Sequence, residues 1–260
     1  SFDDGCLERL GRIHNAEKAR EAVLKAQAAG FDNINLDLMY ALPEQTLAMA
    51  LQDVEQAIAL NPQHLSHYQL TLEPNTLFAA KTPQGIPEMD DAWDMQERCI
   101  ELIQAHGYGQ YEVSAYAKHG KRCQHNLNYW QYGDYLGIGA GAHGKISSGE
   151  SGKILRRWKP KHPETYITSA GTSAGIGGDE CITEANRPFD YMLNALRLHD
   201  GFSLNDFEYR TGLSRTAIQS ELQKAISEQW LQQHGDWVKP TELGMRFAND
   251  VMGLFLKAEK

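Results

Sequence analysis

The segment HNLNYW, residues 125–130, combines side chains that could handle a flat ligand that carries a metal. The imidazole of His125 could bind iron or carry protons, and the amide of Asn126 could orient it. The rings of Tyr129 and Trp130 could stack on an aromatic plane. Alternatively, the histidine only makes hydrogen bonds and the two aromatic residues pack in a core. The residues alone leave both interpretations open.

A second chemical signal is the segment 33–46, NINLDLMYALPEQT, which predicts a strand followed by a turn and a helix cap. Alternate residues of a strand point to opposite faces, so one face is apolar and the other is polar. Asp37 is on the polar face, and α/β barrels bind ligands at the carboxyl ends of their strands. It is therefore a candidate ligand contact; alternatively, it is a buried carboxylate whose partners are backbone amides. The apolar face carries Ile34, Leu36 and Leu38, and the polar face carries Asn33, Asn35, Asp37 and Met39.

The elements around this strand predict a parallel α/β arrangement. Asn15 caps a helix before the strand, and Thr46 caps a second helix that ends at Asn61. A second strand over 64–73 carries polar residues at alternate positions, which we expect to share one polar lumen with Asp37. Helices that alternate with strands are typical of a barrel or of an open sheet. The polar residues of the second strand are His67, Gln69, Thr71 and Glu73.

The middle of the chain predicts a helix over 90–106 and then a strand through Tyr111, Val113 and Ala115. A short strand at 135–138 precedes the GxGxxG pattern of Gly139, Gly141 and Gly144. No helix signal follows these glycines, so we expect a close approach of the backbone rather than a dinucleotide site. A basic, strand-forming segment at 153–161 comes next.

Two domains are predicted, 1–170 and 188–260, joined by a glycine-rich linker loop at 171–187. The second domain has the order helix, helix, helix, hairpin, which is typical of a winged helix. Its helices are expected at 189–198, 204–211 and 214–229, and its strands at 231–233 and 237–239. It carries eight Lys or Arg and ten Asp or Glu residues, so a DNA-binding role is disfavoured.

The length, net charge and cysteine content of the sequence limit the class of protein. The 260 residues carry a formal charge of −9, which argues against a broad nucleic-acid surface. No apolar run approaches the ~20 residues that span a bilayer, and no signal peptide is present at the start. The four cysteines include no CxxC pair, which is typical of a reduced, cytoplasmic chain.

Five segments together carry a family resemblance: NINLDLMYALPEQT, HYQLTLEPNT, YEVSAYA, HNLNYW and DYLGIGAGAHG. They resemble the oxygen-independent coproporphyrinogen III oxidase-like family of radical S-adenosylmethionine (SAM) proteins, over essentially the whole chain. HNLNYW is similar to the HNxxYW cluster of the haem-chaperone branch of that family, called HemW. The resemblance implies an α/β fold: the C-terminal half of a partial (β/α)6 radical-SAM barrel, plus a winged-helix-like, mostly α C-terminal domain.

The resemblance also implies roles for particular residues. Asp37 and Arg12 would contact SAM. Gln69 and Thr71 would lie near its adenosine. His125 would bind haem iron, and the residues around the haem would be Asn126, Tyr129 and Trp130.

One departure from the family is large. Radical SAM chemistry needs a CxxxCxxC loop whose three thiolates hold a 4Fe-4S cluster, and this sequence has no such loop. We therefore expect the chain to be the C-terminal part of a longer protein and to be inactive alone.

Three functions remain as expectations. The first is a haem chaperone that binds haem and delivers it to haem-requiring proteins, with SAM and the cluster governing the process. The alternative is an oxygen-independent coproporphyrinogen III oxidase, an enzyme that decarboxylates the propionates of a porphyrinogen to vinyl groups. The third is a SAM-binding scaffold whose C-terminal domain recruits a partner.

Overall fold

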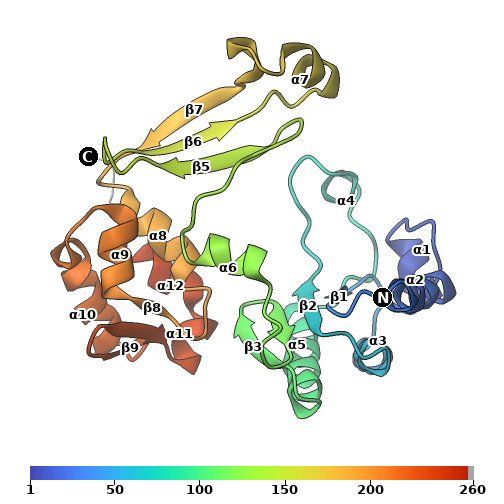
Figure 1. Cartoon of the computed structure of the whole chain (residues 1–260). Coiled ribbons are helices and arrows are strands. Elements are labelled where there is room, and N and C mark those ends of the chain that lie inside the picture. Colours follow the sequence, from blue (N-terminus) through green and yellow to red (C-terminus); the bar gives the residue numbers. More distant parts are fainter. Residues whose placement is uncertain (257–260) are drawn as a thin grey trace. The chain divides into compact units, whose positions relative to one another are not determined.

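The structure is a computed structural model that describes residues 1–256. The chain forms two compact units, Ser1–Cys123 and Gln124–Lys260. In Figure 1 the first unit runs from blue to green and the second from green to red. The division lies well before the predicted linker at 171–187, which instead contains a strand and the start of a helix.

The first unit is a four-stranded mixed sheet with helices, in the strand order β1-β2-β4-β3. β1 and β2 are parallel, whereas β4 is antiparallel to both β2 and β3. The elements in chain order are α1 Asp4–Arg9, α2 Ala16–Ala28, β1 Asn35–Tyr40, α3 Leu47–Ala59, β2 His64–Gln69, α4 Leu77–Ala80, α5 Met89–Ala105, β3 Gly109–Glu112 and β4 Ala115–Ala117.

Local capping explains why the first helices begin where they do. The side chain of Asn15 accepts a hydrogen bond from the backbone N–H of Lys18, and Thr46 accepts one from Met49. α3 ends before Asn61, which has a positive φ of 57°. Both predicted caps are confirmed.

One face of the first sheet is covered by α3 and α5, which pack on each other and on β1. Leu38, Tyr40 and Leu65 point into this core. The helices contribute Ala50, Val54, Ala57, Ala92, Met95, Cys99 and Ile103. The other face of β1, with Asn35 and Asp37, stays free of this helical layer.

The expected polar lumen is wrong in its register. β1 and β2 pair Asp37 with Ser66 and Leu38 with His67, and paired residues of neighbouring strands share a face. His67 therefore lies on the helix side, where it is buried and stacks on Tyr40 with ring centroids 4.6 Å apart. Gln69 pairs with Tyr40, and β2 ends there, before Thr71 and Glu73.

The segment 109–117 also differs from expectation. Tyr111, Val113 and Ala115 do not continue one strand, because the chain turns back between β3 and β4. The hairpin places Tyr111 in the interior of the unit.

The second unit contains two three-stranded sheets, β5-β6-β7 and β8-β10-β9, with all pairs antiparallel. Its core gathers residues such as Tyr191, Phe207 and Val238. The elements are α6 Gln124–Trp130, β5 His143–Ser147, β6 Ile154–Trp158, α7 Pro163–Ser169, η1 Ser173–Gly175, β7 Gly178–Ile182, α8 Arg187–Ala195, β8 Phe202–Ser203, α9 Leu204–Thr211, η2 Arg215–Ile218, α10 Gln219–Ser227, β9 Leu231–His234, β10 Trp237–Pro240, α11 Glu242–Arg246 and α12 Ala248–Gly253.

Of the three glycines expected at a close backbone approach, only Gly144 lies at one: a Cβ atom there would be 3.0 Å from the backbone nitrogen of Gly137, whereas one on Gly139 would meet nothing within 4 Å. The strand expected at 135–138 reduces to a bridge between Tyr135 and Lys145. A Cβ atom on Gly137 would lie 2.4 Å from the carbonyl oxygen of His143, so a side chain is excluded there. The last glycine of the GxGxxG pattern, Gly144, lies in the strand β5, where a pyrophosphate site requires the start of a helix.

Candidate functional site

Asp37 lies on the exposed face of β1 and is held by a neighbouring amide. The side chain of Asn35 donates from Nδ2 to Asp37 Oδ1 over 2.8 Å. The oxygen of the same amide accepts from Ser66 Oγ at 3.2 Å and contacts His64 Nδ1 at 2.6 Å. The carboxylate is exposed rather than buried, so the alternative of a buried Asp satisfied by backbone amides does not apply.

His64 connects this amide to the interior. Its Nε2 lies 2.8 Å from the hydroxyl of Tyr111, which also accepts the backbone N–H of Cys123 at 3.3 Å. Because Asn35 presents an oxygen to Nδ1, that nitrogen carries the proton and Nε2 accepts from Tyr111. Burial lowers the pKa of His64, although the nearby charge of Asp37 opposes this shift. The imidazole is therefore neutral at pH 7.

Arg12 and Asp37 act on the same neighbour, Tyr68. Burial raises the pKa of Tyr68, the charge of Asp37 raises it further, and the charge of Arg12 lowers it. Tyr68 follows Ser66 on the exposed face of β2 and pairs with Met39. Sequence reasoning missed Tyr68 and His64. The strand HLSHYQ has one histidine on each of its two faces, so the alternation of residues does not show which face carries the site.

Gln69 and Thr71 are not brought to this face as the sequence predicted. Gln69 shares the register of Tyr40, on the opposite side of the sheet from Asp37. Thr71 lies beyond β2, where its hydroxyl donates to Glu73 Oε1 over 2.9 Å.

The turn after β1 fixes the carboxyl end of the strand. The buried carboxylate of Asp53 accepts the backbone N–H of Phe2 at 2.6 Å and the amide of Gln45 at 3.3 Å. Gln45 in turn accepts the backbone N–H of Leu42. This explains the LPEQT segment, since its glutamine closes the turn from inside the core.

His125 lies on α6, not on a loop. Its exposed ring meets the ring of Tyr129 edge-on, with centroids 4.9 Å apart, and Tyr129 lies 4.5 Å from the ring of Tyr135. Residues four apart share one side of a helix, which explains the first contact. Neither ring nitrogen of His125 has a hydrogen-bond partner within residues 1–256. Both nitrogens are therefore available to a ligand.

Trp130 and Asn126 play different parts in α6. The ring of Trp130 is covered by the guanidinium of Arg197, 4.3 Å from the centroid, and is half-buried. Asn126 is also half-buried, and across residues 1–256 no hydrogen bond joins it to His125. The structure thus places Trp130 as an anchor of the helix and leaves the predicted orienting role of Asn126 without support.

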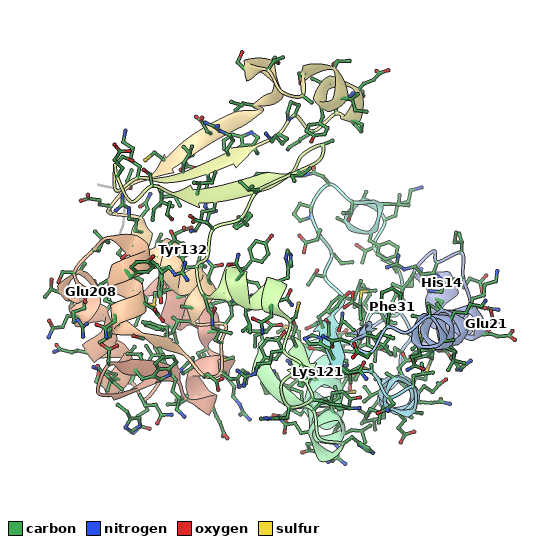
Figure 2. All side chains as sticks on the ribbon, in the orientation of Figure 1. His14, Glu21, Phe31, Lys121, Tyr132 and Glu208 are labelled. Atoms are coloured by element: carbon green, nitrogen blue, oxygen red, sulfur yellow. The ribbon has the colours of Figure 1, made fainter. Side chains whose placement is uncertain are left out.

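The end of α6 is fixed by a polar cluster that includes Tyr132, which is labelled in Figure 2. Tyr132 has a positive φ of 57°, and its hydroxyl donates to Asp190 of α8 over 2.6 Å. The buried ammonium of Lys145 binds the carbonyl of Tyr132 at 3.1 Å and Asp134 at 3.0 Å. These bonds hold the helix that carries His125.

Residues 1–256 do not form a site for an iron–sulfur cluster. Within residues 1–256, no group of three His, Cys, Asp or Glu side chains is arranged to hold a metal ion. Burial raises the pKa of Cys6 to about 11 and of Cys99 to about 12, which keeps these thiols protonated.

No helix within residues 1–256 is long and apolar enough to cross a bilayer.

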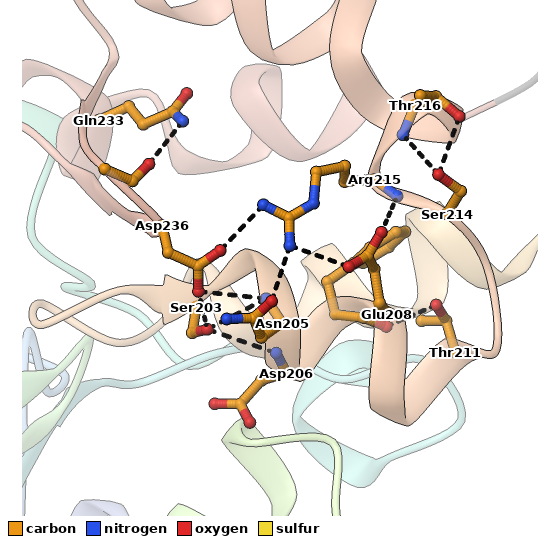
Figure 3. Close-up of polar contacts among 12 residues, drawn as sticks. Ser203, Asn205, Asp206, Glu208, Thr211, Ser214, Arg215, Thr216, Gln233 and Asp236 are labelled. Atoms are coloured by element: carbon orange, nitrogen blue, oxygen red, sulfur yellow. Dashed lines mark hydrogen bonds and ion pairs between the residues drawn. The ribbon is translucent and has the colours of Figure 1, made fainter.

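Arg215, the first residue of η2, pairs with side chains of its own unit (Figure 3). Arg215 donates to Asp236 Oδ1 and Glu208 Oε2, each at 2.9 Å, and to Asn205 Oδ1 at 2.7 Å. The bond from Arg215 lowers the pKa of Glu208. The guanidinium therefore ties α9 to the turn between β9 and β10.

A cavity of about 310 Å³ lies between the β5–β6 turn and the end of α9. None of the residues that the sequence singled out as site residues lines it. Its walls are formed by Asp134, Ser147, Ser148, Gly149, Gly152, Lys153, Ile154, Tyr209, Arg210, Thr211 and Gly212.

Comparison with known proteins shows the family of this chain. A family model described as the HemN C-terminal domain matches residues 182–247. The heme chaperone HemW of Haemophilus influenzae is 45% identical over 100% of this chain and 66% of its own length. The heme chaperone HemW of Escherichia coli is 44% identical over 98% of this chain and 66% of its own length. The heme chaperone HemW of Bacillus subtilis is 32% identical over 98% of this chain and 67% of its own length. The chain belongs to the HemW family.

This HemW-family chain spans about two thirds of the length of these relatives. A solved structure also matches it, that of the E. coli coproporphyrinogen III oxidase HemN, described as a radical SAM enzyme. The TM-score is 0.77 at 16% identity, over 98% of this chain and 62% of that one. At this identity the likeness shows the fold alone, an α/β fold of the kind found in HemN.

Proposed function

We propose that this chain binds haem and is part of a protein that delivers haem to haem-requiring proteins. The observation that carries the proposal is the helix α6, whose exposed His125 keeps both ring nitrogens without a hydrogen-bond partner in residues 1–256. A neutral imidazole with a free nitrogen is a common ligand of haem iron. The names of the relatives, heme chaperone HemW, support the same function.

The neighbours of His125 suit a porphyrin. Tyr129 and Tyr135 continue from the imidazole as a series of aromatic rings, with centroid distances of 4.9 and 4.5 Å. Such rings offer apolar area and stacking to a flat macrocycle. Trp130 and Asn126 would complete the helix that presents the ligand.

SAM would bind at the exposed face of β1. In this proposal the carboxylate of Asp37 accepts hydrogen bonds from SAM and the guanidinium of Arg12 pairs with its carboxylate. The charge of Asp37 raises the pKa of Tyr68 and the charge of Arg12 lowers it, so both charges act on that side chain. Gln69 and Thr71 would approach the adenosine only from the end of β2. Thiolates of the 4Fe-4S cluster would come from outside this sequence, which has no CxxxCxxC loop.

The finer fold assignment belongs to the same proposal. The parallel pair β1–β2, with α3 between its strands, would be part of a (β/α)6 barrel. The elements α8 to α12 would form a winged-helix-like domain, since three helical segments precede the β9–β10 hairpin.

A haem titration tests the proposed function. Ferric haem is added to the 260-residue chain and to His125→Ala, and the Soret band is followed. We expect a saturable shift in the unmutated chain and its loss in the variant. His143→Ala is the matched control, because His143 is also exposed and also lies in the second unit, stacked on Trp158. An equal shift in His125→Ala would contradict the assignment of the ligand.

The likeness to HemN does not favour the enzyme alternative, since it concerns the fold. Anaerobic product analysis distinguishes the two functions. Vinyl products formed from coproporphyrinogen III by the intact protein would contradict a purely chaperone function.

A further inference from the structure

Four side chains and one backbone amide of the first unit form a continuous hydrogen-bonded series. It runs from the N–H of Cys123 to the Tyr111 hydroxyl, then to His64, to the amide of Asn35 and to Asp37. The three links between side chains are 2.8, 2.6 and 2.8 Å long. Tyr111 and His64 are buried, whereas Asp37 is exposed. The series thus connects the interior to the proposed SAM contact.

The direction of the hydrogen bonds follows from the Asp37 end of the series. A carboxylate can only accept, so Asn35 donates to Asp37 through its Nδ2 group and turns its Oδ1 to His64. Nδ1 of His64 then carries the proton of the neutral ring, and Nε2 accepts from the Tyr111 hydroxyl. The hydroxyl oxygen also accepts the backbone N–H of Cys123, so all four bonds fit one tautomer of His64 and one orientation of the Asn35 amide.

The consequence for Asp37 is a fixed orientation of the amide beside it. If Asn35 rotated by half a turn, its oxygen would face the carboxylate and its NH2 group would face Nδ1–H. Both contacts would be unfavourable, because each would pair two acceptors or two donors. His64 therefore selects the orientation in which the amide supports the carboxylate, with one carboxylate oxygen bonded and the other open to a ligand.

We propose that His64, fixed by Tyr111, is a positioning residue for SAM: it acts through Asn35 to hold the Asp37 carboxylate ready for the ligand. This inference rests on the proposed contact between Asp37 and SAM. It assigns a role to His64 and Tyr111. The sequence pattern had instead favoured His67 and Gln69, which lie on the opposite face of β2 from His64. Preorganised groups bind more tightly because less freedom is lost when the ligand arrives.

The test uses Tyr111→Phe, which removes one hydroxyl and keeps the ring. SAM is titrated calorimetrically into the intact protein, which includes the cluster segment, and into its variants. We expect Tyr111→Phe to weaken SAM binding about fivefold, which corresponds to one ordinary hydrogen bond. Tyr108→Phe is the matched control, since this buried tyrosine donates to the carbonyl of Pro62 over 2.7 Å, outside the series. Its SAM affinity should be unchanged.

A spectroscopic signature separates positioning from a general loss of structure. The ¹⁵N chemical shifts of His64 should report a neutral ring protonated on Nδ1 in the unmutated chain and in Tyr108→Phe. In Tyr111→Phe the two tautomers should mix. A ring protonated on Nε2 in the unmutated chain would overturn the inference.

The outcomes distinguish this inference from the function it rests on. If Asp37→Ala weakens SAM binding but Tyr111→Phe behaves like Tyr108→Phe, the positioning role is wrong and the SAM contact stands. If Asp37→Ala has no effect, or the intact protein does not bind SAM, the proposed contact is wrong and the positioning role falls with it.

Discussion

Two histidine–tyrosine pairs of this chain have similar ring geometry and opposite surroundings. The rings of His64 and Tyr111 meet at 68° with centroids 5.6 Å apart, and those of His125 and Tyr129 meet at 80° and 4.9 Å. Both nitrogens of His64 are engaged, in a buried position, by Asn35 and Tyr111. His125 is exposed, and neither nitrogen is engaged within the described residues. Hydrogen bonding to the ring, and not the residue type or its aromatic neighbour, separates a structural histidine from a candidate ligand.

The largest expected difference between the two pairs is in stability. His64→Ala should lower the free energy of unfolding by about 3 kcal/mol, because it leaves a cavity and deprives the buried hydroxyl of Tyr111 of its partner. His125→Ala should change it by less than about 0.5 kcal/mol, as is usual for an exposed side chain. Urea unfolding of both variants measures the contrast. Equal effects would remove the distinction between the two histidines.

A third histidine, His67, extends the comparison to the pH dependence of stability. Burial lowers the pKa of His67 to about 4, and its Nδ1 has no partner in the described residues. In the unfolded chain His67 is protonated below about pH 6.5, whereas in the folded chain it stays neutral until the pH approaches 4. Its contribution to the free energy of unfolding is therefore fully present above about pH 6.5 and is lost as the pH falls toward 4.

His67→Phe keeps a ring against Tyr40 and removes the titrating group. Between pH 7 and pH 5 it should lose about 2 kcal/mol less stability than the unmutated chain. Urea unfolding at both pH values measures the difference. His64 also has a lowered pKa, so part of the pH dependence should remain. An unchanged pH dependence would contradict the burial of a neutral His67.

A substitution of Asp37 should change stability as little as one of His125, because both side chains are exposed. Asp37→Ala removes one hydrogen bond, that from Asn35, and should change the free energy of unfolding by less than about 0.5 kcal/mol. SAM affinity should nevertheless fall about tenfold, because a charged acceptor is lost. Thermal unfolding and calorimetry on the same sample test both parts. A large loss of stability would make Asp37 a structural residue.

Much of the fold could be predicted because local chemistry decides it. Leu204–Thr211 is a helix with the predicted bounds, since Ser203 caps its start and Gly212 adopts a left-handed conformation at its end. The β3–β4 hairpin could not be predicted, because Tyr111, Val113 and Ala115 alternate as one strand would. The division after Cys123 has no composition signal, whereas the glycine-rich segment 171–179 has one and lies within a single unit.

The site was predictable in its residue types but not in its register. Asp37 was found because an acidic residue interrupts an apolar strand. The face of β2 was missed because both alternating positions contain a histidine, and only the pairing of Leu65 with Leu36 in the core decides between them. The free nitrogens of His125 are a property of its surroundings, which no single-sequence pattern reports.

The interior end of the hydrogen-bonded series has a thermodynamic consequence. It terminates on the backbone N–H of Cys123, two residues before His125 in the chain. A ligand at Asp37 that tightens the series would restrain Cys123, the residue directly before α6. Linkage then requires reciprocity: any factor by which SAM changes the affinity for haem is the factor by which haem changes the affinity for SAM.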